Sequence, residues 1–358
     1  MTDTLFASDL AHLSRREFLR WLGRGALGLF ALPFLDPYTR RERLNHPPDG
    51  TAVSRVRCVD DHVAVYDRPS FSAALRQVYW RDLVFEVDEV VIGDEQPTHN
   101  RVWYHLKGKG FAHSGKLQPV EVRLNPPASS VPPTGWLAEV TVPYTDTLRD
   151  LNPPDRPGYR LYYSTVHWVQ KVLKDSEGAV WYQLWDDKFK RVYYARAEHL
   201  HLLKPEEIAP LAETVPPETK RIEVWLKDQL VIAYENDEPV LITRAATGGK
   251  FIDGDYSTPQ GRYLTNRKRP SRHMASGDLA APNSYDLPGV PWVCYLTESG
   301  ISFHGTYWHN DFGKPRSHGC INLSPAAARW IYRWTHPAVP FDQATWWEDT
   351  GTSVVVRG

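Results

Sequence analysis

The segment Phe303–Asn322, "FHGTYWHNDFGKPRSHGCIN", gathers three histidines and one of the chain's three cysteines in one short stretch. A thiol and an imidazole brought together can form a nucleophile, and the same groups can bind zinc. A cysteine can also be an inert buried residue that only packs. The spacing of these side chains must be weighed against all three chemistries.

The pair His318 and Cys320, in "SHGC", cannot act alone as base and nucleophile. Side chains two residues apart on an extended chain stand about 6.5 to 7 Å apart, too far for a direct hydrogen bond. His304 ends the preceding predicted strand and is followed by Gly305. It would reach Cys320 if the residues between them folded back as a hairpin lid, and its imidazole would then remove the thiol proton.

Gly319, beside the cysteine, would let a substrate carbonyl approach backbone N–H groups that form an oxyanion hole. This arrangement suits acyl transfer. A zinc site has the right ligand types in His304, His309, His318 and Cys320, but their spacing matches no ordinary zinc ribbon or finger. A buried structural Cys320 is the third reading.

Side chains between the two motifs have alternative roles. We expect His309 to be a solvated lid residue, whereas Tyr307 and Trp308 either pack over a bound peptide or anchor the loop. The basic run "NRKRPSRH", residues 266–273, is either a solvated face or a patch that reads carboxylates, and its composition favours the solvated face.

Apolar alternation predicts the strands that position the segment. Apolar residues alternate with polar ones in three runs, at residues 222–226, 230–234 and 240–242. Lys-Asp and Asn-Asp turns separate the runs, which predicts a β-meander. The stretch "VPWVCYLTESGISFHG", Val290–Gly305, predicts two more strands.

One helix is predicted directly after the cysteine motif. Ser324 is a good N-cap and Pro325 suits the first helical position. Trp330, Ile331 and Trp334 would then share one helix face that packs under the motif.

Composition limits the class of protein. A chain of 358 residues with 42% apolar content can bury a large core and should hold two or three domains. The net charge of -1 gives no bias toward nucleic acid. The 14 Trp, 18 Tyr, 29 Pro and 23 Gly favour short strands joined by turns, so we expect a mainly β protein.

Three cysteines cannot all pair within one chain, which excludes a disulfide scaffold. In an exported protein, a bridge between Cys58 and Cys294 would leave Cys320 free, although nothing in the sequence brings those two together.

An approximate repeat covers residues 51–203. The anchor "VWY" at Val102–Tyr104 recurs 78 residues later at Val180–Tyr182, within segments of short alternating strands. Two small antiparallel barrels are expected. Trp103 and Trp181 are more consistent with core positions than with a peptide or glycan groove. The two units resemble bacterial SH3-like domains, which are often attached to cell-wall enzymes.

The N-terminal segment "SRREFLRWLGRGALGLFALPFL" resembles a twin-arginine export signal, with Arg15 and Arg16 before a modest apolar run. An amphipathic surface helix is the alternative. Residues 25–35 are too few for an ordinary spanning helix, which needs about 20. We expect an exported, extracytoplasmic protein in the periplasm or cell wall, with this segment either cleaved or kept as a membrane anchor.

The motifs in "STPQGRY", "LPGVPW" and "FHGTYWHNDFGKPRSHGCINLS" together resemble the L,D-transpeptidase catalytic family of the YkuD type. The resemblance covers residues 221–358 and implies that Cys320 is the nucleophile and His304 the general base. His318 and Gly319 would lie beside the oxyanion site. The loop before Ser317 is somewhat shorter than in many family members.

The resemblance also implies a substrate and its contacts. The enzyme would take a peptidoglycan tetrapeptide stem, release D-alanine, hold the rest as a thioester and pass it to an amine. The expected substrate-binding residues are Gly305, Tyr307, Trp308, Arg316, Ser317 and Asn322, with Ser317 and Asn322 supporting the loop and Arg316 placed to pair with a stem carboxylate. Neither a cofactor nor a metal is expected. Alternatives are an L,D-carboxypeptidase that uses water and a non-catalytic wall-binding protein.

The predicted organisation has four parts. Residues 1–50 form the signal or anchor and linker, 51–125 the first SH3-like domain, 134–205 the second, and 219–358 an L,D-transpeptidase-type β-sandwich with one principal helix. Proline-rich linkers at residues 125–135 and 204–220 separate these units. Peptidoglycan stem peptides are the expected partners.

Overall fold

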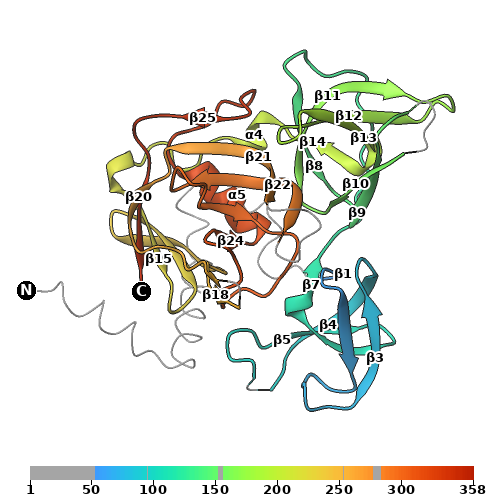
Figure 1. The fold of residues 1–358 in the computed structure, drawn as a ribbon, viewed down its shortest axis with the longest axis vertical. Coiled ribbons are helices and arrows are strands. Elements are labelled where there is room, and N and C mark those ends of the chain that lie inside the picture. The colour runs from blue at the N-terminus through green and yellow to red at the C-terminus, as the bar shows by residue number, and fades with distance from the viewer. Residues whose placement is uncertain (1–52, 95, 152–155, 253, 277–283) are drawn as a thin grey trace, which may run out of the picture. The chain divides into compact units, whose positions relative to one another are not determined.

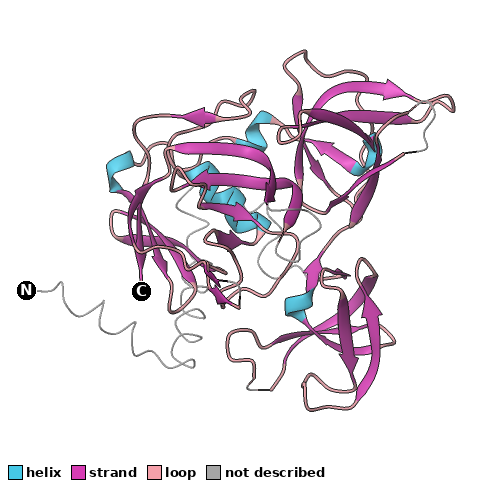
Figure 2. Cartoon of the chain, viewed as in Figure 1, coloured by secondary structure: helices cyan, strands magenta, loops and turns pink. Residues whose placement is uncertain are grey.

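The computed structural model describes residues 53–94, 96–151, 156–252, 254–276 and 284–358. The predicted export signal lies outside these residues. Strands dominate the described part (Figure 2), which agrees with the expected mainly β fold. No helix of the described part combines the length and apolar character of a membrane span.

The first sheet module contains seven antiparallel strands in the order β3-β2-β6-β5-β4-β1-β7. Its strands are β1 (Arg55–Cys58), β2 (His62–Tyr66), β3 (Leu75–Trp80), β4 (Val84–Ile92), β5 (Val102–Leu106), β6 (Gly110–His113) and β7 (Leu117–Pro119), and a short 3-10 helix, η2 (Ser114–Lys116), precedes β7. Alternating residues such as Val63 and Val65 point into its core. Trp103 is also fully buried, but outside that cluster, where its ring contacts Tyr66 and Phe71.

The second sheet module repeats this strand order as β10-β9-β13-β12-β11-β8-β14. Its strands are β8 (Trp136–Val140), β9 (Tyr144–Leu148), β10 (Pro157–Tyr162), β11 (Val166–Lys174), β12 (Val180–Asp186), β13 (Arg191–Arg196) and β14 (Leu200–Leu202), with η3 (Ala197–His199) before β14. The two "VWY" anchors occupy equivalent strands, β5 and β12, and Trp181 is buried. The repeat read from the sequence is therefore a repeat of topology.

No closed barrel is found among the described residues of either module. Among the described residues, β3 and β7 end the first sheet and β10 and β14 end the second, and neither pair of end strands is hydrogen-bonded to close a barrel. The bulges that bend β4 and β11 curve each sheet without joining its edges. The likeness to SH3 domains stays a prediction.

The C-terminal domain, residues 220–357, has two five-stranded sheets around an apolar core. One sheet has the order β17-β16-β15-β26-β20, with strands β15 (Lys220–Trp225), β16 (Leu230–Glu235), β17 (Glu238–Arg244), β20 (Gly261–Leu264) and β26 (Ser353–Arg357). The other has the order β24-β23-β22-β21-β25, with strands β21 (Arg267–Ser276), β22 (Tyr285–Tyr295), β23 (Ser302–Gly305), β24 (Ile321–Leu323) and β25 (Trp346–Trp347). The strands β18 (Lys250–Phe251) and β19 (Gly254–Asp255) form a separate two-stranded ribbon. Two short helices, α4 (Pro205–Ile208) and η4 (Pro217–Thr219), precede the domain.

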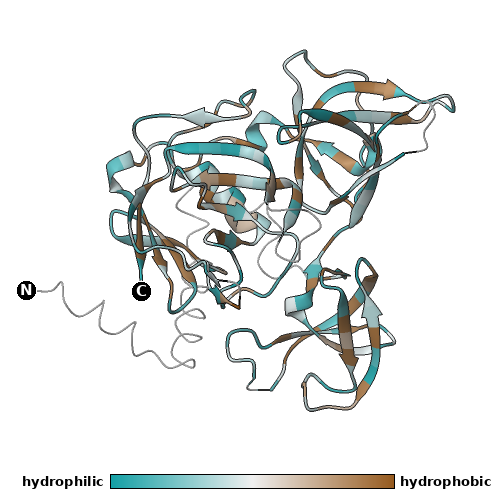
Figure 3. Cartoon of the chain, in the orientation of Figure 1, coloured by the Kyte–Doolittle hydropathy of each residue, from teal (hydrophilic) through white to brown (hydrophobic). Residues whose placement is uncertain are grey.

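Helix α5 (Pro325–Trp334) lies against β22 and β23 (Figure 1). The predicted N-cap is confirmed, because the Ser324 hydroxyl accepts a hydrogen bond from the Ala327 N–H. Ile331 and Trp334 are buried, and Trp330 stacks on Trp334 at 5.2 Å. The predicted meander is likewise present as β15, β16 and β17. Apolar and hydrophilic bands alternate along several strands (Figure 3).

The basic run at 266–273 is not a solvated face. It forms most of β21, and two of its basic residues, Lys268 and His273, are buried. The Lys268 ammonium donates hydrogen bonds to the carbonyls of Tyr332, Thr335 and Pro337 at the C-terminal end of α5. A cation is favourable there because helix C-termini carry unsatisfied carbonyls and a partial negative charge.

Candidate active site

Cys320 lies at the end of the loop that enters β24. β24 pairs with β23 in parallel register, with Phe303 opposite Ile321 and His304 opposite Asn322. Cys320 is therefore beside Ser302, whose hydroxyl oxygen is 3.7 Å from Sγ. Successive strand residues alternate in direction, so Ser302 and His304 face the same side of the sheet as the thiol.

The thiol is held in its neutral form. Its S–H donates to the Gly300 carbonyl at 3.8 Å, and burial raises the pKa of Cys320 although hydrogen bonds from Ser302 oppose that shift. Removing the proton thus requires a base, because the desolvated thiolate is disfavoured at rest.

His304 is suited to be that base. Its side chain is 2% exposed, and burial lowers its pKa to about 4, so the imidazole is neutral at physiological pH. Nδ1 lies 3.1 Å from the carbonyl oxygen of Gly305, which accepts its proton in a hydrogen bond and leaves the Nε2 lone pair free. Gly305 itself packs between Pro291 and Pro325.

The predicted hairpin lid does not form. His304 lies on β23 and Cys320 directly precedes β24, and the two come together because β24 returns to pair with β23 in the same direction. In the described part of the chain, Sγ is hydrogen-bonded to Ser302 and Gly300 and not to His304. Catalytic contacts are often longer in a free enzyme than in its substrate complex, so this geometry is compatible with proton transfer once a substrate is bound.

A compact hydrogen-bond network fixes the turn before Cys320. The Ser317 hydroxyl donates to the Cys320 carbonyl and accepts from the Gly319 N–H at 3.2 Å. Gly319 has φ of +114°, a conformation that glycine adopts without strain. Because its N–H is already bound, an oxyanion hole would depend on neighbouring amides, and the role of Gly319 there stays a prediction.

Sequence reasoning missed a second support of this turn. The Thr258 hydroxyl donates to the Gly319 carbonyl at 2.8 Å and accepts from the Gly248 N–H at 2.9 Å. A Cβ on Gly248 would lie 2.7 Å from the Gly319 Cα, so only glycine allows this approach. The glycine pair in "ATGG" was the available signal in the sequence.

His309 is buried, contrary to the expectation of a solvated lid residue. It is 4% exposed, and burial lowers its pKa to about 3. The Asp311 N–H donates to Nδ1, so the neutral ring carries its proton on Nε2. This N–H bonds to the Asn322 side chain, 3.0 Å away, with the amide oxygen turned toward the ring, an orientation that also gives the buried Oδ1 a partner. Asn322 therefore supports the loop from inside.

The remaining predicted residues are distributed around the thiol. Tyr307 is 2% exposed and its hydroxyl donates to the Pro288 carbonyl, so it anchors the loop. Trp308 is half-buried with its ring 5.7 Å from the His304 ring. Arg316 is exposed but donates to Asp311 at 3.0 Å, which leaves its predicted contact with a stem carboxylate untested.

His318 is exposed and contacts Tyr256, with ring centroids 4.3 Å apart. Among the residues that the structure describes, no group of three or more His, Cys, Asp or Glu side chains is arranged to hold a metal. Cys58 and Cys294 are both free thiols, so the alternative disulfide is not formed.

Fold and site together define a two-sheet β-sandwich with a half-buried cysteine just before β24 and a neutral imidazole on the adjacent parallel strand β23. The family model for the YkuD L,D-transpeptidase catalytic domain matches residues 219–356 of this chain. The expected mainly β fold, with an L,D-transpeptidase-type β-sandwich, is confirmed. A search of curated proteins found no significant match.

Solved L,D-transpeptidases resemble part of the chain. One from Mycobacterium smegmatis is 24% identical over 39% of this chain and 59% of its own, with a TM-score of 0.32. A cysteine-to-serine mutant of the Enterococcus faecium enzyme is 21% identical, and the match covers 39% of this chain and 50% of that structure, with a TM-score of 0.30. L,D-transpeptidase 3 from Mycobacterium tuberculosis is 21% identical, and the match covers 39% of this chain and 61% of that structure, with a TM-score of 0.31. The chain thus spans about half to three fifths of these structures.

Proposed function

We propose that this protein is an exported cysteine L,D-transpeptidase that acts on peptidoglycan tetrapeptide stems. The observation that carries the proposal is the neutral His304, bound through Nδ1 to the Gly305 carbonyl on the strand beside Cys320. The family match to residues 219–356 supports a transpeptidase-type activity for that region.

In the proposed acylation, the Cys320 sulfur attacks the carbonyl carbon of the bond that precedes the terminal D-alanine. His304 Nε2 takes the thiol proton and gives it to the leaving amine, so D-alanine departs and a thioester remains. An acceptor amine then attacks the thioester, its proton returns through His304, and the thiol is regenerated. The charge that develops on the carbonyl oxygen needs backbone N–H donors near the 317–320 turn.

Product analysis tests the reaction. The full chain is incubated with a disaccharide tetrapeptide, and the products are separated by chromatography and identified by mass. We expect free D-alanine and a cross-linked dimer, both lost in Cys320→Ala. Conversion only to the tripeptide would replace transpeptidation with L,D-carboxypeptidase activity. Absence of any turnover by folded, reduced protein would favour a wall-binding role.

Export is part of the proposal and rests on the sequence of residues 14–35 alone. A twin-arginine receptor reads the arginine pair, so replacing Arg15 and Arg16 with lysine should retain the protein in the cytoplasm. Fractionation of cells that express each form checks this. Normal export of the double variant would overturn the assignment of the signal.

A further inference from the structure

The loop between His304 and Ser317, here called the 306–316 loop, is bound to the first sheet module. The Asn310 backbone N–H donates to the Gly115 carbonyl at 3.1 Å. Its side-chain amide donates to the carbonyls of Ser114 and Leu117 at 3.3 and 3.0 Å. One asparagine thus makes three hydrogen bonds to backbone that precedes it by 193 to 196 residues.

The neighbouring Asp311 strengthens this contact. It is 5% exposed, and its carboxylate lies 2.8 Å from Nε2 of His99 in the first sheet module. A Cβ on Gly115 would approach the Asp311 carboxylate carbon to 2.9 Å, so the approach requires glycine at this position. Lys314 and Arg316 of the same loop also pair with Asp311.

A second attachment holds the beginning of the loop. Arg57 of β1 is 2% exposed, and its guanidinium donates to the Tyr307 carbonyl at 2.9 Å. The guanidinium also lies over the ring of Tyr162, 4.1 Å from its centroid, and that ring stacks on Tyr307. A buried, multiply bonded arginine is a rigid contact, since its planar donors are held in one geometry.

The other side of the loop reaches the reacting groups. The Asp311 N–H donates to His309 Nδ1, and His309 Nε2 faces the Asn322 amide. Asn322 is opposite His304 in the pairing of β24 with β23 and is two residues after Cys320. Each link from the first sheet module to the two catalytic strands is therefore a direct contact.

We propose that the first sheet module positions the catalytic groups, with Asn310 as the positioning residue. Its contacts with residues 114–117 hold His309 against Asn322, which fixes the strand that carries Cys320 relative to His304. This inference rests on the proposed function. Proton transfer between thiol and imidazole is sensitive to displacements of about 1 Å, which can lower a rate by about a hundredfold. A contact of this kind can therefore control a rate without touching the substrate.

Asn310→Ala in the full chain tests the proposal, with Asn125→Ala as a matched control. Asn125 also spans two chain segments, because its N–H and side-chain amide donate to the Glu198 carbonyl and its amide donates to Thr141. Two readouts are used. The first is alkylation of Cys320 by iodoacetamide across pH 5 to 10, located by peptide mapping. The second is kcat and KM on the disaccharide tetrapeptide.

For Asn310→Ala we expect alkylation at neutral pH to slow about tenfold and its pH dependence to move to higher pH, because a displaced His304 assists thiol ionisation less. On the disaccharide tetrapeptide, kcat should fall by a similar factor with little change in KM. Asn125→Ala should match the wild type in both readouts. A purely stabilising loop contact would lower the melting temperature and leave the pH profile of the folded protein in place.

Gly115→Ala disturbs the same contact from the side of the first sheet module. It is the second test variant, for use if Asn310→Ala does not fold. Its added Cβ displaces Asp311, so it should shift the alkylation profile in the same direction. The double variant should lose less than the sum of the two single effects, because both act through one contact. Wild-type alkylation and kcat in both folded single variants would overturn the inference. If the wild type fails to process the tetrapeptide while the variants still shift the alkylation profile, the proposed function fails and the positioning role stands.

Discussion

The proposed nucleophile and the proposed base are both uncharged at rest. Burial raises the pKa of Cys320 and lowers that of His304 to about 4, so the site holds a thiol and an imidazole and not an ion pair. A standing thiolate is therefore disfavoured at rest, which limits its unwanted oxidation. The same shifts determine how the rate should depend on pH.

The acid limb of kcat/KM should lie near pH 4 and not near the ordinary histidine pKa of about 6.5. His304 accepts a proton only while it is unprotonated, and burial keeps it so until the pH falls to about 4. Rates on the tetrapeptide between pH 3.5 and 8 measure this limb, with circular dichroism at each pH as the control for folding. A midpoint near 6.5 in folded protein would contradict the desolvated state of His304.

Thr258 offers a test of the turn that carries Cys320. Thr258→Val leaves the Gly319 carbonyl and Gly248 N–H without their shared partner, so we expect about 1 to 3 kcal/mol less stability and at least about a tenfold lower kcat. Thr147→Val is the control, because that buried hydroxyl bridges the N–H and carbonyl of Tyr159 in the second sheet module. Equal loss of kcat in both variants would mean that instability, and not the turn, lowers the rate.

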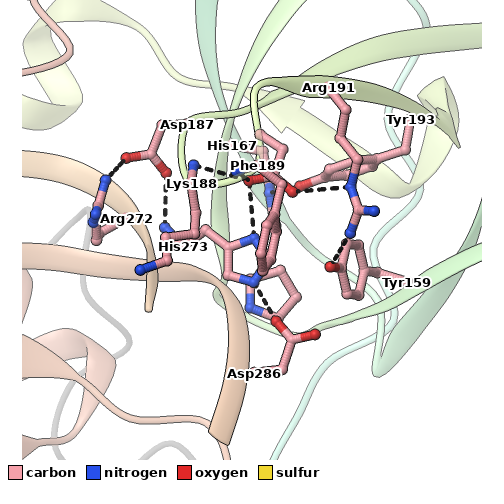
Figure 4. Close-up of polar contacts among 12 residues, drawn as sticks. Tyr159, His167, Asp187, Lys188, Phe189, Arg191, Tyr193, Arg272, His273 and Asp286 are labelled. Atoms are coloured by element: carbon pink, nitrogen blue, oxygen red, sulfur yellow. Dashed lines mark hydrogen bonds and ion pairs between the residues drawn. The ribbon is translucent and has the colours of Figure 1, made fainter. Parts of the chain in front are cut away.

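At the scale of elements, β21 links the second sheet module to the C-terminal domain. Buried His273 of β21 lies between two carboxylates, Asp186 of β12 at 3.0 Å and Asp286 of β22 (Figure 4). Asp187 accepts from the His273 backbone N–H and pairs with Arg272. Such a histidine is stabilised in its charged form.

Several other groups surround His273 and its two carboxylates. Burial by itself lowers the pKa of His273, but its hydrogen bonds to Asp186 and Asp286 raise it overall. Arg191 also lies near Asp186, and the neutral His167 and the ring of Tyr159 lie close by. The net effect favours the charged form of His273, which joins β12 and β22 through opposite charges.

The stabilising effect of His273 should depend on pH in one direction. Because its folded-state pKa is raised, its contribution to the free energy of unfolding is complete below the unfolded pKa and is lost as pH rises through the folded pKa. The difference in melting temperature between wild type and His273→Asn should therefore shrink as pH rises above about 6.5. Melting curves from pH 5.5 to 9 measure it, with exposed His62→Asn as control. A difference that grows with pH would reverse the assigned charge.

At the scale of the whole described chain, one apolar core crosses a module boundary. Leu137, Val166 and Trp168 of the second sheet module belong to the same buried cluster as Trp292 and Ile331 of the C-terminal domain. Leu137 and Val140 lie on opposite faces of β8, and Val140 belongs to the core of its own module. The two faces of one strand thus serve different cores.

Leu137→Ala should therefore weaken the C-terminal domain as well as the second module. We expect a loss of about 2 to 5 kcal/mol and faster amide exchange in β22 and α5, because the cavity opens in the shared core. Val140→Ala removes an equally buried side chain from the same strand and should speed exchange mainly in β9 to β13. Identical exchange patterns in the two variants would show that the shared core does not couple these units.

Local signals in the sequence predicted much of the fold. Alternation identified the meander at β15–β17, the cap at Ser324 identified α5, and the "SHGC" motif identified Cys320. Burial of His309 and Lys268 could not be predicted in this way. Their partners, Asn322 and the carbonyls after Tyr332, meet them only through tertiary packing.

The binding of the 306–316 loop to the first sheet module shows the same limit more strongly. Asn310 and Gly115 lie far apart in sequence, and neither lies in a segment whose composition indicates an interface. Alternation of apolar residues likewise predicts strands but not which edges pair, so it could not show whether either sheet closes. Long-range pairing had to come from the structure.

Intact-mass measurement of acylated protein tests the central claim most directly. The full chain, reduced and folded, is mixed with a disaccharide tetrapeptide whose free amines are acetylated, so that no amine acceptor is present. We predict a mass gain equal to the acetylated disaccharide tripeptide acyl group, mapped to Cys320, with one D-alanine released per adduct. The gain should be absent in Cys320→Ala and slow in His304→Ala. No adduct, or an adduct on a residue other than Cys320, would contradict the assignment of this thiol as the nucleophile.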